Sequence, residues 1–436
     1  MSLLRIDEIF NFEKGVLQSS KCVPGEYDFI TASADWKTHN EYTHDCEALI
    51  FAAAASGSLG RTHYVNGKFI SSDLCFIITP KDQENLPVDL KFYHILFNEL
   101  KDEIVRNTKA GTSKEAIGLG SFGKYQLPYF DIDTQIEIKN RFVKSEELKS
   151  DLSNELTHQV GLVKKLRQQL LQDAVHGKLV EQNPKDEPAS ELLKKIKKQK
   201  DALIKQKKLK IGRATEQSVS LINDVEIPKS WQWCKSDEIF FVTKLAGFEY
   251  SEHISLKESG EIPVVRAQNV RPLSIDKTNL LYIDAKTSAT LERCALIKKC
   301  LLVTFIGAGI GDVATFEETE RWHLAPNVAK MEPFEGCEEL INVKYLNYFL
   351  MSKLGQREIF KHVKATAQPS LSMGTIRDID FAIPPLAEQK RIVQKLDELI
   401  QYCNELEASI KQSESQNEKL LQQVLRESLR KEPVEA

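Results

Sequence analysis

Long apolar runs are missing from this chain of 436 residues. The longest uninterrupted apolar segment, residues 48–55, is less than half of the roughly 20 residues that a membrane-spanning helix needs. The first residues also lack the basic and then apolar pattern of a secretory signal. We therefore expect no membrane anchor and no export, which leaves a cytoplasmic protein.

Metal-binding patterns of cysteine and histidine are missing as well. None of the eight cysteines belongs to a Cys-x-x-Cys pair, and the nine histidines include no His-Glu-x-x-His motif. Scattered cysteines fit the reduced thiols of a cytosol and argue against a disulfide framework or a zinc ribbon. The sequence therefore predicts no structural metal.

Two glycine-rich fragments imitate nucleotide-binding motifs. Residues 118–124 nearly match a P-loop, but Tyr125 stands where a magnesium-binding Ser or Thr is required, and Pro128 follows where a helix should run. We expect a flexible loop there. Residues 307–311 resemble the glycine loop of a methyl-donor or dinucleotide site, but the β-rich residues 312–316 that follow favour a turn between two strands.

Other catalytic patterns fail on chemistry or spacing. The single Pro-Pro, Pro384-Pro385, follows isoleucine rather than the Asp, Asn or Ser of an adenine methyltransferase motif. Asp131, Asp133 and Glu137 are too close in sequence to lie on separate strands around a nuclease metal. Because no Ser-His-Asp or Cys-His arrangement can be assigned either, we expect no catalytic residue.

What the chain does contain is one internal repeat. Residues 132–171 and 386–425 share their apolar phase at a constant separation of 254, without a gap. Ahead of them the match is weaker but runs in the same order, with the second copy 21 residues longer between the first two landmarks. The landmarks are Asp7-Glu8-Ile9-Phe10 with Asp237-Glu238-Ile239-Phe240, Ser58-Leu59-Gly60 with Gly309-Ile310-Gly311, Lys91-Phe92 with Lys344-Tyr345, and Lys109-Ala110 with Lys364-Ala365.

The two repeated segments predict long helices, each with an apolar seam at alternating steps of four and three. Helices of equal length can supply each other's partner, and the globular half between them allows antiparallel pairing. The globular halves predict a mixed α/β structure, with strands near 74–79 and 301–305 and helices over 90–103 and 343–354. The predicted seams are Ile392, Leu396, Leu399, Cys403, Leu406, Ile410, Leu420 and Val424, and in the first segment Leu152, Leu156, Val163, Leu166 and Leu170.

Charge is uneven along the chain, although its net value is only −4. Residues 194–210 contain nine lysines and a single acid, Asp201. Two interpretations stay open at this point, a solvated helix face and a stripe that faces phosphates.

Three stretches resemble the specificity subunits of type I restriction–modification enzymes. Residues 166–193 resemble their central helical region, 227–233 the entry to their second target-recognition domain, and 383–393 the start of their closing helical region. The chain departs from the family pattern at 127–135, and its beginning lacks the Pro-x-x-Trp entry.

The resemblance implies an α+β fold, in which two mixed α/β target-recognition domains are separated by two long helices that form an antiparallel coiled coil. Each domain would read one half of a bipartite site on double-stranded DNA, and the helices would set the spacing. On this plan the recognition domains are residues 1–134 and 213–386. Residues 135–212, with the basic helix, and 387–436 are the helical spacers.

The resemblance also implies partners and a role in bacterial defence. Two modification subunits would bind S-adenosylmethionine and methylate adenine, and two restriction subunits, where present, would use ATP and magnesium. The chain itself would bind no cofactor or metal and would catalyse nothing.

We predict DNA contacts at polar residues in loops at matching repeat positions. Arg, Gln and Asn pair with base edges, whereas Lys and Thr suit phosphates. The candidates are Arg61, Lys109, Thr112, Ser113 and Lys114 in the first copy and Arg266, Gln268, Asn269, Arg271, Lys364, Thr366, Gln368 and Ser370 in the second.

Two other functions remain alternatives to this assignment. One is the recognition subunit of a type IIB-like restriction enzyme, which cuts on both sides of its site and carries cleavage and methylation in one partner. The other is a coiled-coil scaffold that joins two protein-binding heads and binds no DNA.

Overall fold

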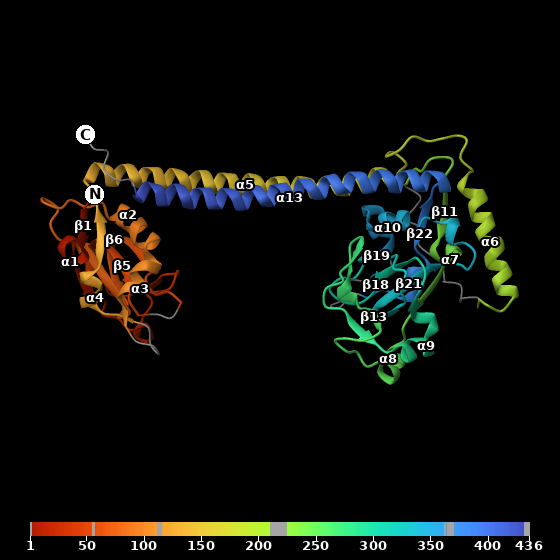
Figure 1. Ribbon diagram of the computed structural model, residues 1–436, viewed down its shortest axis with the longest axis horizontal. Coiled ribbons are helices and arrows are strands. Elements are labelled where there is room, and N and C mark those ends of the chain that lie inside the picture. The colour runs from red at the N-terminus through yellow and green to blue at the C-terminus, as the bar shows by residue number, and fades with distance from the viewer. Residues whose placement is uncertain are drawn as a thin grey trace. The chain divides into compact units, whose positions relative to one another are not determined.

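The chain divides into two compact units, which are described one at a time (Figure 1). The computed structural model describes residues 2–54, 57–110, 116–209, 225–361, 363 and 370–430. Unit 1 comprises residues 1–156 and 412–436, and unit 2 comprises residues 157–411. Two long helices, α5 (Ile132–Val175) and α13 (Leu386–Arg430), contribute residues to both units. No described helix combines the length and the apolar character that a membrane span requires.

Unit 1 is built on a six-stranded sheet that also contains its longest apolar run. The elements of the unit are β1 (Ser2–Arg5), α1 (Ile6–Ile9), β2 (Phe10–Lys14), η1 (Ser19–Lys21), β3 (Tyr27–Ile30), β4 (Lys37–His39), β5 (His44–Ala52), β6 (Thr62–Ser71), β7 (Cys75–Pro80), α2 (Leu90–Glu99), α3 (Lys101–Thr108), β8 (Lys109–Ala110), β9 (Ala116–Ile117), α4 (Leu119–Lys124), β10 (Gln126–Tyr129) and the first part of α5. The strand order is β2-β7-β5-β6-β3-β4. Residues 48–52 of the central strand β5 are fully buried, so this run is a core strand.

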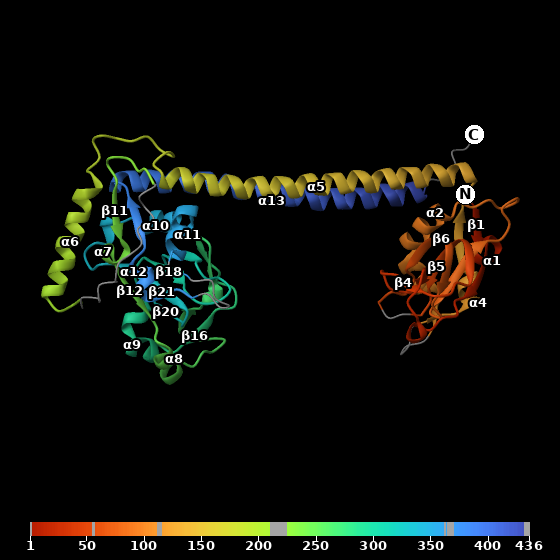
Figure 2. The same ribbon diagram turned by 180° about the vertical axis from the view of Figure 1, so that it is seen from behind.

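Unit 2 holds two four-stranded sheets, ordered β12-β21-β18-β19 and β16-β13-β20-β17. Helix α6 covers one side of the unit beside β11 and α7 (Figure 2). The elements are α6 (Ala189–Lys205), β11 (Gln232–Lys235), α7 (Ser236–Ile239), β12 (Phe240–Lys244), α8 (Gly247–His253), β13 (Ile262–Val265), η3 (Ala267–Asn269), β14 (Val270–Arg271), β15 (Ser274–Ile275), β16 (Leu281–Ile283), α9 (Ala285–Thr290), η4 (Glu292–Cys294), β17 (Ala295–Leu296), β18 (Cys300–Thr304), β19 (Val313–Phe316), β20 (Trp322–Leu324), β21 (Val328–Pro333), η5 (Glu338–Leu340), α10 (Val343–Met351), α11 (Lys353–Phe360), α12 (Met373–Arg377) and β22 (Asp380–Ile383).

The two units share a four-stranded antiparallel core, which confirms the repeat seen in the sequence. The antiparallel order β2-β7-β5-β6 of unit 1 corresponds to β12-β21-β18-β19 of unit 2. Each unit also contains one parallel pair, β3 with β6 and β13 with β20. The repeated tetrapeptides end the matching one-turn helices α1 and α7, and Phe10 and Phe240 follow them with nearly equal backbone angles.

A buried glutamine attaches each long helix to its own globular part at the same repeat position. Gln135 accepts a hydrogen bond from the backbone N–H of Asp89 at 2.8 Å and donates to the carbonyl of Phe130 at 2.7 Å. Gln389 accepts from the N–H of Asn342 at 2.9 Å and donates to the carbonyl of Pro384 at 2.9 Å. Asp89 and Asn342 are the N-caps of α2 and α10. Because both glutamines are fully buried, they fix where each long helix begins.

The helices predicted over 90–103 and 343–354 are confirmed apart from one break in each, and one other local prediction was wrong. The second break follows from Ser352, whose hydroxyl caps α11 by accepting from the N–H of Gly355. The loop predicted at 118–124 is instead the short helix α4, because Phe122 is buried in the core of unit 1 and holds the segment down.

Within unit 2, α5 and α13 run antiparallel. Arg167 of α5 donates to Glu407 at 2.6 Å and to Asn404 at 2.8 Å. Beyond the end of α5, Asp186 accepts from Arg391 near the start of α13 at 2.7 Å. Later residues on the α5 side therefore contact earlier residues of α13, which confirms the predicted antiparallel pairing here.

The predicted seams were correct only in part. On α13, Ile392, Leu396 and Cys403 are buried, but Leu406 is 51% and Leu420 is 60% exposed. The ion pair of Arg167 and Glu407 lies between the two helices. The apolar residues next to it in sequence, Leu166 and Leu406, therefore lie on the exposed side of the helix pair. On α5, Leu156 and Val163 are buried, and Leu152 and Leu166 are exposed; the side chain of Val424 lies outside the described residues.

We expect the pair of Arg167 and Glu407 to stabilise unit 2 in a pH-dependent way. Hydrogen bonds from Lys411 and from Arg167 lower the pKa of Glu407 from 4.5 to about 2. A depressed carboxyl pKa stabilises the fold above the unfolded value, so the contribution is lost as the pH falls from about 4.5 to about 2. A double-mutant cycle with Arg167→Ala and Glu407→Ala should give a coupling of about 0.5–1 kcal/mol at pH 7.

Urea unfolding of the wild type, the two single variants and the double variant measures this coupling at pH 7 and at acidic pH down to about 2. The pair Lys395 and Glu398, which lies on α13 alone, is the control for a salt bridge that joins no second helix. A coupling that stayed constant down to pH 2 would contradict the assignment.

Candidate nucleic-acid interface

A glycine turn joins β18 to β19 in unit 2, as the sequence predicts for residues 307–311. The N–H of Gly311 donates to the carbonyl of Thr304 at 2.9 Å, and the N–H of Thr304 donates to that of Asp312 at 3.0 Å. Gly311 has a φ of +87°, and a Cβ there would lie 2.6 Å from the Phe360 ring. Only glycine therefore allows the turn to lie against the end of α11.

Unit 1 builds the same turn between β5 and β6. The N–H of Gly60 donates to the carbonyl of Ala52 at 2.8 Å, and the N–H of Ala52 donates to that of Arg61 at 2.8 Å. Gly60 has a φ of +81°, and a Cβ would meet Val105 of α3 at 2.7 Å. This confirms the alignment of Ser58-Leu59-Gly60 with Gly309-Ile310-Gly311. It also places Arg61 where unit 2 has Asp312.

In each unit the turn lies beside the segment that follows the second group of candidates. The N–H of Leu371 donates to the carbonyl of Phe305 at 2.9 Å, and the N–H of Ile117 donates to that of Ala53 at 2.8 Å. The glycine turn and the segment after the second group therefore lie together at matching positions of both units. The predicted match of Arg61 with residues 266–271 was wrong, because Arg61 lies at the position of Asp312. Thr112, Ser113, Lys114, Lys364, Thr366 and Gln368 themselves lie outside the described residues.

A third element flanks each turn, and it differs between the units; in unit 2 it contains the predicted contact residue Arg271, although the hairpin itself was not predicted. In unit 2 the β14–β15 hairpin lies along β19, where the N–H of Leu273 donates to the carbonyl of Val313 at 2.9 Å. In unit 1 the short connection between β3 and β4 takes this place, because Arg61 donates to the carbonyl of Ala32 at 3.2 Å. The 21 extra residues of the second copy precede this turn and were the available signal, but their length alone did not indicate a hairpin.

The candidates that the structure describes differ in exposure. Gln268, Arg271, Lys109 and Ser370 are exposed. Arg266 is partly buried and donates to the carbonyl of Asn279 at 2.6 Å. Arg61, in addition to Ala32, donates to Ser58 at 3.4 Å.

Asn269 is a correction. Its side chain is 1% exposed and accepts from the N–H of Arg266 at 3.1 Å while donating to the carbonyl of Asp276 at 3.0 Å. Because both ends of the amide hold the loop before the hairpin, the side chain has no surface to offer to a base. Asn269 is therefore a structural residue.

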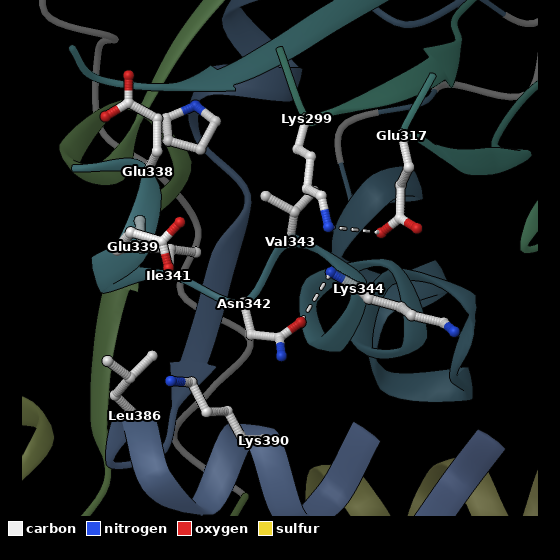
Figure 3. Close-up of a pocket in the computed structure, with 11 residues that line it drawn as sticks. Lys299, Glu317, Glu338, Glu339, Ile341, Asn342, Val343, Lys344, Leu386 and Lys390 are labelled. Atoms are coloured by element: carbon white, nitrogen blue, oxygen red, sulfur yellow. Dashed lines mark hydrogen bonds and ion pairs between the residues drawn. The ribbon is translucent and has the colours of Figure 1, made fainter. Parts of the chain in front are cut away.

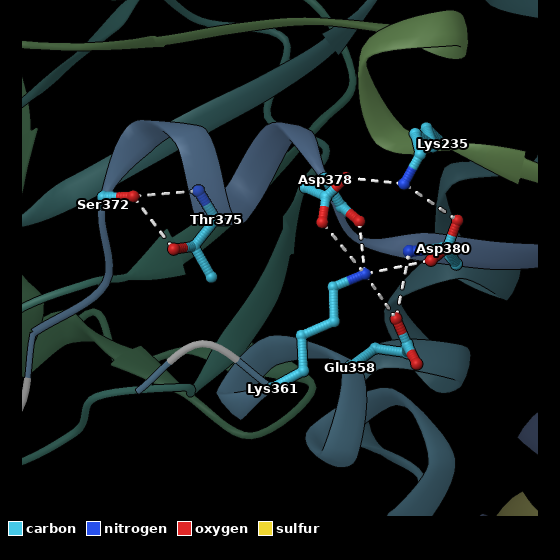
Figure 4. Close-up of polar contacts among 7 residues, drawn as sticks. All are labelled: Lys235, Glu358, Lys361, Ser372, Thr375, Asp378 and Asp380. Atoms are coloured by element: carbon cyan, nitrogen blue, oxygen red, sulfur yellow. Dashed lines mark hydrogen bonds and ion pairs between the residues drawn. The ribbon is translucent and has the colours of Figure 1, made fainter. Parts of the chain in front are cut away.

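A buried group of charges holds together the two segments that lie before and after the second candidate loop (Figure 4). The ammonium of Lys361, which is fully buried at the end of α11, lies 2.9 Å from Glu358 and 2.9 Å from Asp380 of β22. Asp378, at the end of α12, accepts from Lys235 of β11 at 2.5 Å. The cluster thus ties four elements of unit 2 together by charge-assisted hydrogen bonds.

A cavity of about 320 Å³ opens at the start of α10 (Figure 3). Both lysines and glutamates line it, and Lys299 lies 3.8 Å from Glu317. Asn342 caps α10 there by accepting from the N–H of Lys344 at 3.1 Å. Charges of both signs neutralise each other at this cavity, so it does not attract phosphates in particular.

The lysine-rich segment forms α6, which favours the solvated-face interpretation. Its apolar face, with Leu192, Ile196 and Leu203, is buried in the core of unit 2. Several lysines on the helix are paired, such as Lys195 with Glu187 at 2.7 Å. Gln199 donates to the carbonyl of Glu335, which follows β21 at the end away from the glycine turn.

The stretches that carry the family resemblance meet at one junction in unit 2. Gln182 donates to the buried Glu388 and accepts from Ser230 at 3.2 Å. Gly177, which follows α5 with a φ of +68°, packs on Pro228, where a Cβ would lie 2.4 Å from the ring. These motifs therefore build a structural joint between the helices and the second globular part. Among the residues that the structure describes, no group of three or more His, Cys, Asp or Glu side chains could hold a metal ion.

Comparison with known proteins agrees with this architecture. The model of the type I restriction modification DNA specificity domain matches residues 2–160 and 228–413, more than half of the chain. The specificity subunit of the type I restriction enzyme EcoAI from Escherichia coli is 29% identical over 251 residues, which are 56% of this chain and 41% of that protein. The chain thus aligns with less than half of this relative's length.

Two solved structures share the fold. A chain from a structure on complex assembly and conformational transition of the type I R-M system is 15% identical, with 98% of this chain and 97% of that chain covered and a TM-score of 0.56. The HsdS subunit from Thermoanaerobacter tengcongensis is 14% identical, with 98% and 96% covered and a TM-score of 0.50. Two mixed α/β parts and two long helices are therefore the fold, and this chain belongs to the family of type I restriction–modification specificity proteins.

Proposed function

We propose that this chain is the DNA sequence-recognition subunit of a type I restriction–modification enzyme, in which each of two domains reads one half of a bipartite site. The observation that carries the proposal is the recurrence, in two related units, of the same glycine turn beside the segment that follows the same candidate loop. Family membership supports it. Residues 1–134 and 213–386 are the proposed reading domains, and the third element at each turn gives each domain its own target.

Exposed apolar side chains on the long helices support docking of modification subunits. Leu162 and Leu166 of α5 are 48% and 44% exposed, and Tyr402 and Leu406 of α13 are 54% and 51% exposed. Each lies one position before a residue that faces the other helix, so in an antiparallel pair both rows lie on the same side. A contiguous apolar strip of this kind is typical of a helix-binding surface.

We expect the double variant Leu166→Glu and Leu406→Glu to lose the modification subunit. Burying two carboxylates in that contact should weaken binding roughly thirtyfold or more, the effect of losing about 2 kcal/mol. Co-purification and titration calorimetry measure it, with Lys164→Glu on the other flank of α5 as the control. Unchanged binding in the double variant would exclude the strip as the docking site.

The chemistry of the complex belongs to the partners in this proposal. Two modification subunits bind S-adenosylmethionine and methylate adenine, and two restriction subunits, where present, use ATP and magnesium in the cytoplasm. The long helices, of 44 and 45 residues and about 66 Å each, set the separation of the half-sites. This chain binds DNA and partners and catalyses nothing.

Alanine replacement of Lys364 and Gln368 should weaken recognition of one half-site only. A lysine suits a phosphate and a glutamine suits an adenine edge, so their loss affects the domain that carries them. Fluorescence anisotropy with duplexes altered in one half-site or the other separates the two domains. The matched variant is Lys114→Ala with Thr112→Ala in the first domain. An equal loss at both half-sites would contradict two independent readers.

A further inference from the structure

Arg271 and Asp312 lie close together at the glycine turn of unit 2, on two elements that are joined through the backbone. Arg271 ends β14, and two residues later the N–H of Leu273 donates to the carbonyl of Val313 at 2.9 Å. Asp312 directly precedes Val313 and closes the turn through its own carbonyl. The β14–β15 hairpin therefore holds the arginine beside the aspartate.

The carboxylate of Asp312 lacks a hydrogen-bond donor among the residues that the structure describes. It folds back over the turn, since a Cβ at Gly309 would lie only 2.9 Å from its Oδ2 atom. Burial raises the pKa of Asp312, and the charge of Arg271 opposes that rise. A partly desolvated acceptor without a donor is costly, and a ligand that supplies an N–H removes the cost.

The guanidinium of Arg271 is exposed and makes no hydrogen bond or ion pair with the described part of the chain. It is near enough to Asp312 and Asp276 to affect their pKa, but it contacts neither. By contrast, the guanidinium groups of Arg266 and Arg61 donate hydrogen bonds to backbone carbonyls. Arg271 thus keeps its planar fork of donors available.

We propose that Arg271 and Asp312 together read one G·C base pair in the major groove. The guanidinium of Arg271 donates to O6 and N7 of guanine, and the carboxylate of Asp312 accepts from N4 of the paired cytosine. Those three groups form the major-groove edge of a single base pair, so an arginine and an aspartate held close together match it and match neither orientation of A·T.

The inference rests on the proposed function and confines this reading to the second half-site. In unit 1 the position of Asp312 belongs to Arg61, whose guanidinium is held by the carbonyl of Ala32 and the hydroxyl of Ser58. Among its described residues, unit 1 has no acidic side chain at the turn and no hairpin like β14–β15. The two half-sites are therefore read by different chemistry, although the turns are the same.

The test maps methylated adenines in methylation-free cells that express the full chain with its neighbouring modification subunit. Arg271→Ala and Asp312→Ala should each relax one and the same G·C position of the second half-site, with discrimination there reduced roughly tenfold or more. Arg271→Lys and Asp312→Asn, which keep a donor or an acceptor, should retain part of it. Lys286→Ala, an exposed charge on α9, is the matched control.

Three results would overturn the inference and leave the proposed function intact. These are a wild-type second half-site without a G·C pair, variants whose motif is unchanged, and variants that lose the whole half-site although thermal unfolding shows that they fold like the wild type. A wild-type chain that directs no motif at all would instead refute the proposed function. Thermal unfolding of each variant shows whether the turn still folds.

Discussion

Replacing Lys361 by methionine is expected to lower the free energy of unfolding of unit 2 by about 3–5 kcal/mol, the usual cost of breaking a buried ion pair. The ammonium is the only cation within 4 Å of Glu358 among the described residues, and it also contacts Asp378 and Asp380. Without it, Lys235 still contacts the two aspartates, whereas Glu358 stays buried with no other cation of the described residues within 4 Å.

The charge of Lys361 also gives the effect a pH signature. Burial lowers the pKa of Lys361, but hydrogen bonds to Asp380 and Glu358 outweigh it and leave the pKa above 10.5. A raised lysine pKa stabilises the fold fully below the unfolded value, and the contribution is lost as the pH rises through the folded value. The difference between wild type and variant should therefore be constant through neutral pH and should shrink above about pH 10.5.

Denaturant unfolding measures this difference, and Lys353→Met is the matched control. Lys353 begins the same helix, α11, but is exposed, so its loss should change stability by less than about 0.5 kcal/mol. If Lys361→Met lowered the free energy of unfolding no more than Lys353→Met, the cluster would not hold together the segments before and after the second candidate loop.

Replacing Gln389 by alanine should cost about 2–4 kcal/mol, because it leaves a partly buried N–H of Asn342 and a buried carbonyl of Pro384 without their hydrogen-bond partner. Gln135→Ala should cost a similar amount in unit 1, where the glutamine makes the same contacts. Since the glutamines fix the first turn of the long helices, we also expect faster amide exchange at the starts of α5 and α13.

The control for both glutamines is Gln394→Ala. Gln394 lies on α13 only a few residues further on and is exposed, so its loss should be nearly neutral. A loss at Gln389 no larger than at Gln394 would mean that the helix start is fixed by apolar packing alone.

The sequence predicted the repeat, the long helices and the glycine turn because each has a periodic or local signature. The starts of α5 and α13 lie at the predicted separation, just before the proposed boundaries at 135 and 387. The glycines at 60 and 311 could be aligned because their backbone conformation demands glycine.

What the sequence could not predict depends on contacts between distant residues. Leu406 and Glu407 are adjacent, and only the position of Arg167 on the other helix decides which of them faces it. Asn269 was expected on the surface because its type suits a base, but its amide satisfies the backbone of its own loop. The proximity of Arg271 to Asp312 depends on residues far apart in sequence, which a hairpin of two short strands brings near each other.

The most direct test of the account is a genome-wide map of methylated adenines in methylation-free cells that express the neighbouring modification subunit, with and without this chain. We predict a new bipartite motif, with a spacer of constant length, that appears only when the chain is present. A neighbouring subunit that fuses methyltransferase and nuclease, with cleavage on both sides of the motif, would identify the related type IIB-like enzyme instead. If the two proteins co-purified and no motif appeared, the recognition function would be wrong and a scaffold that binds no DNA would take its place.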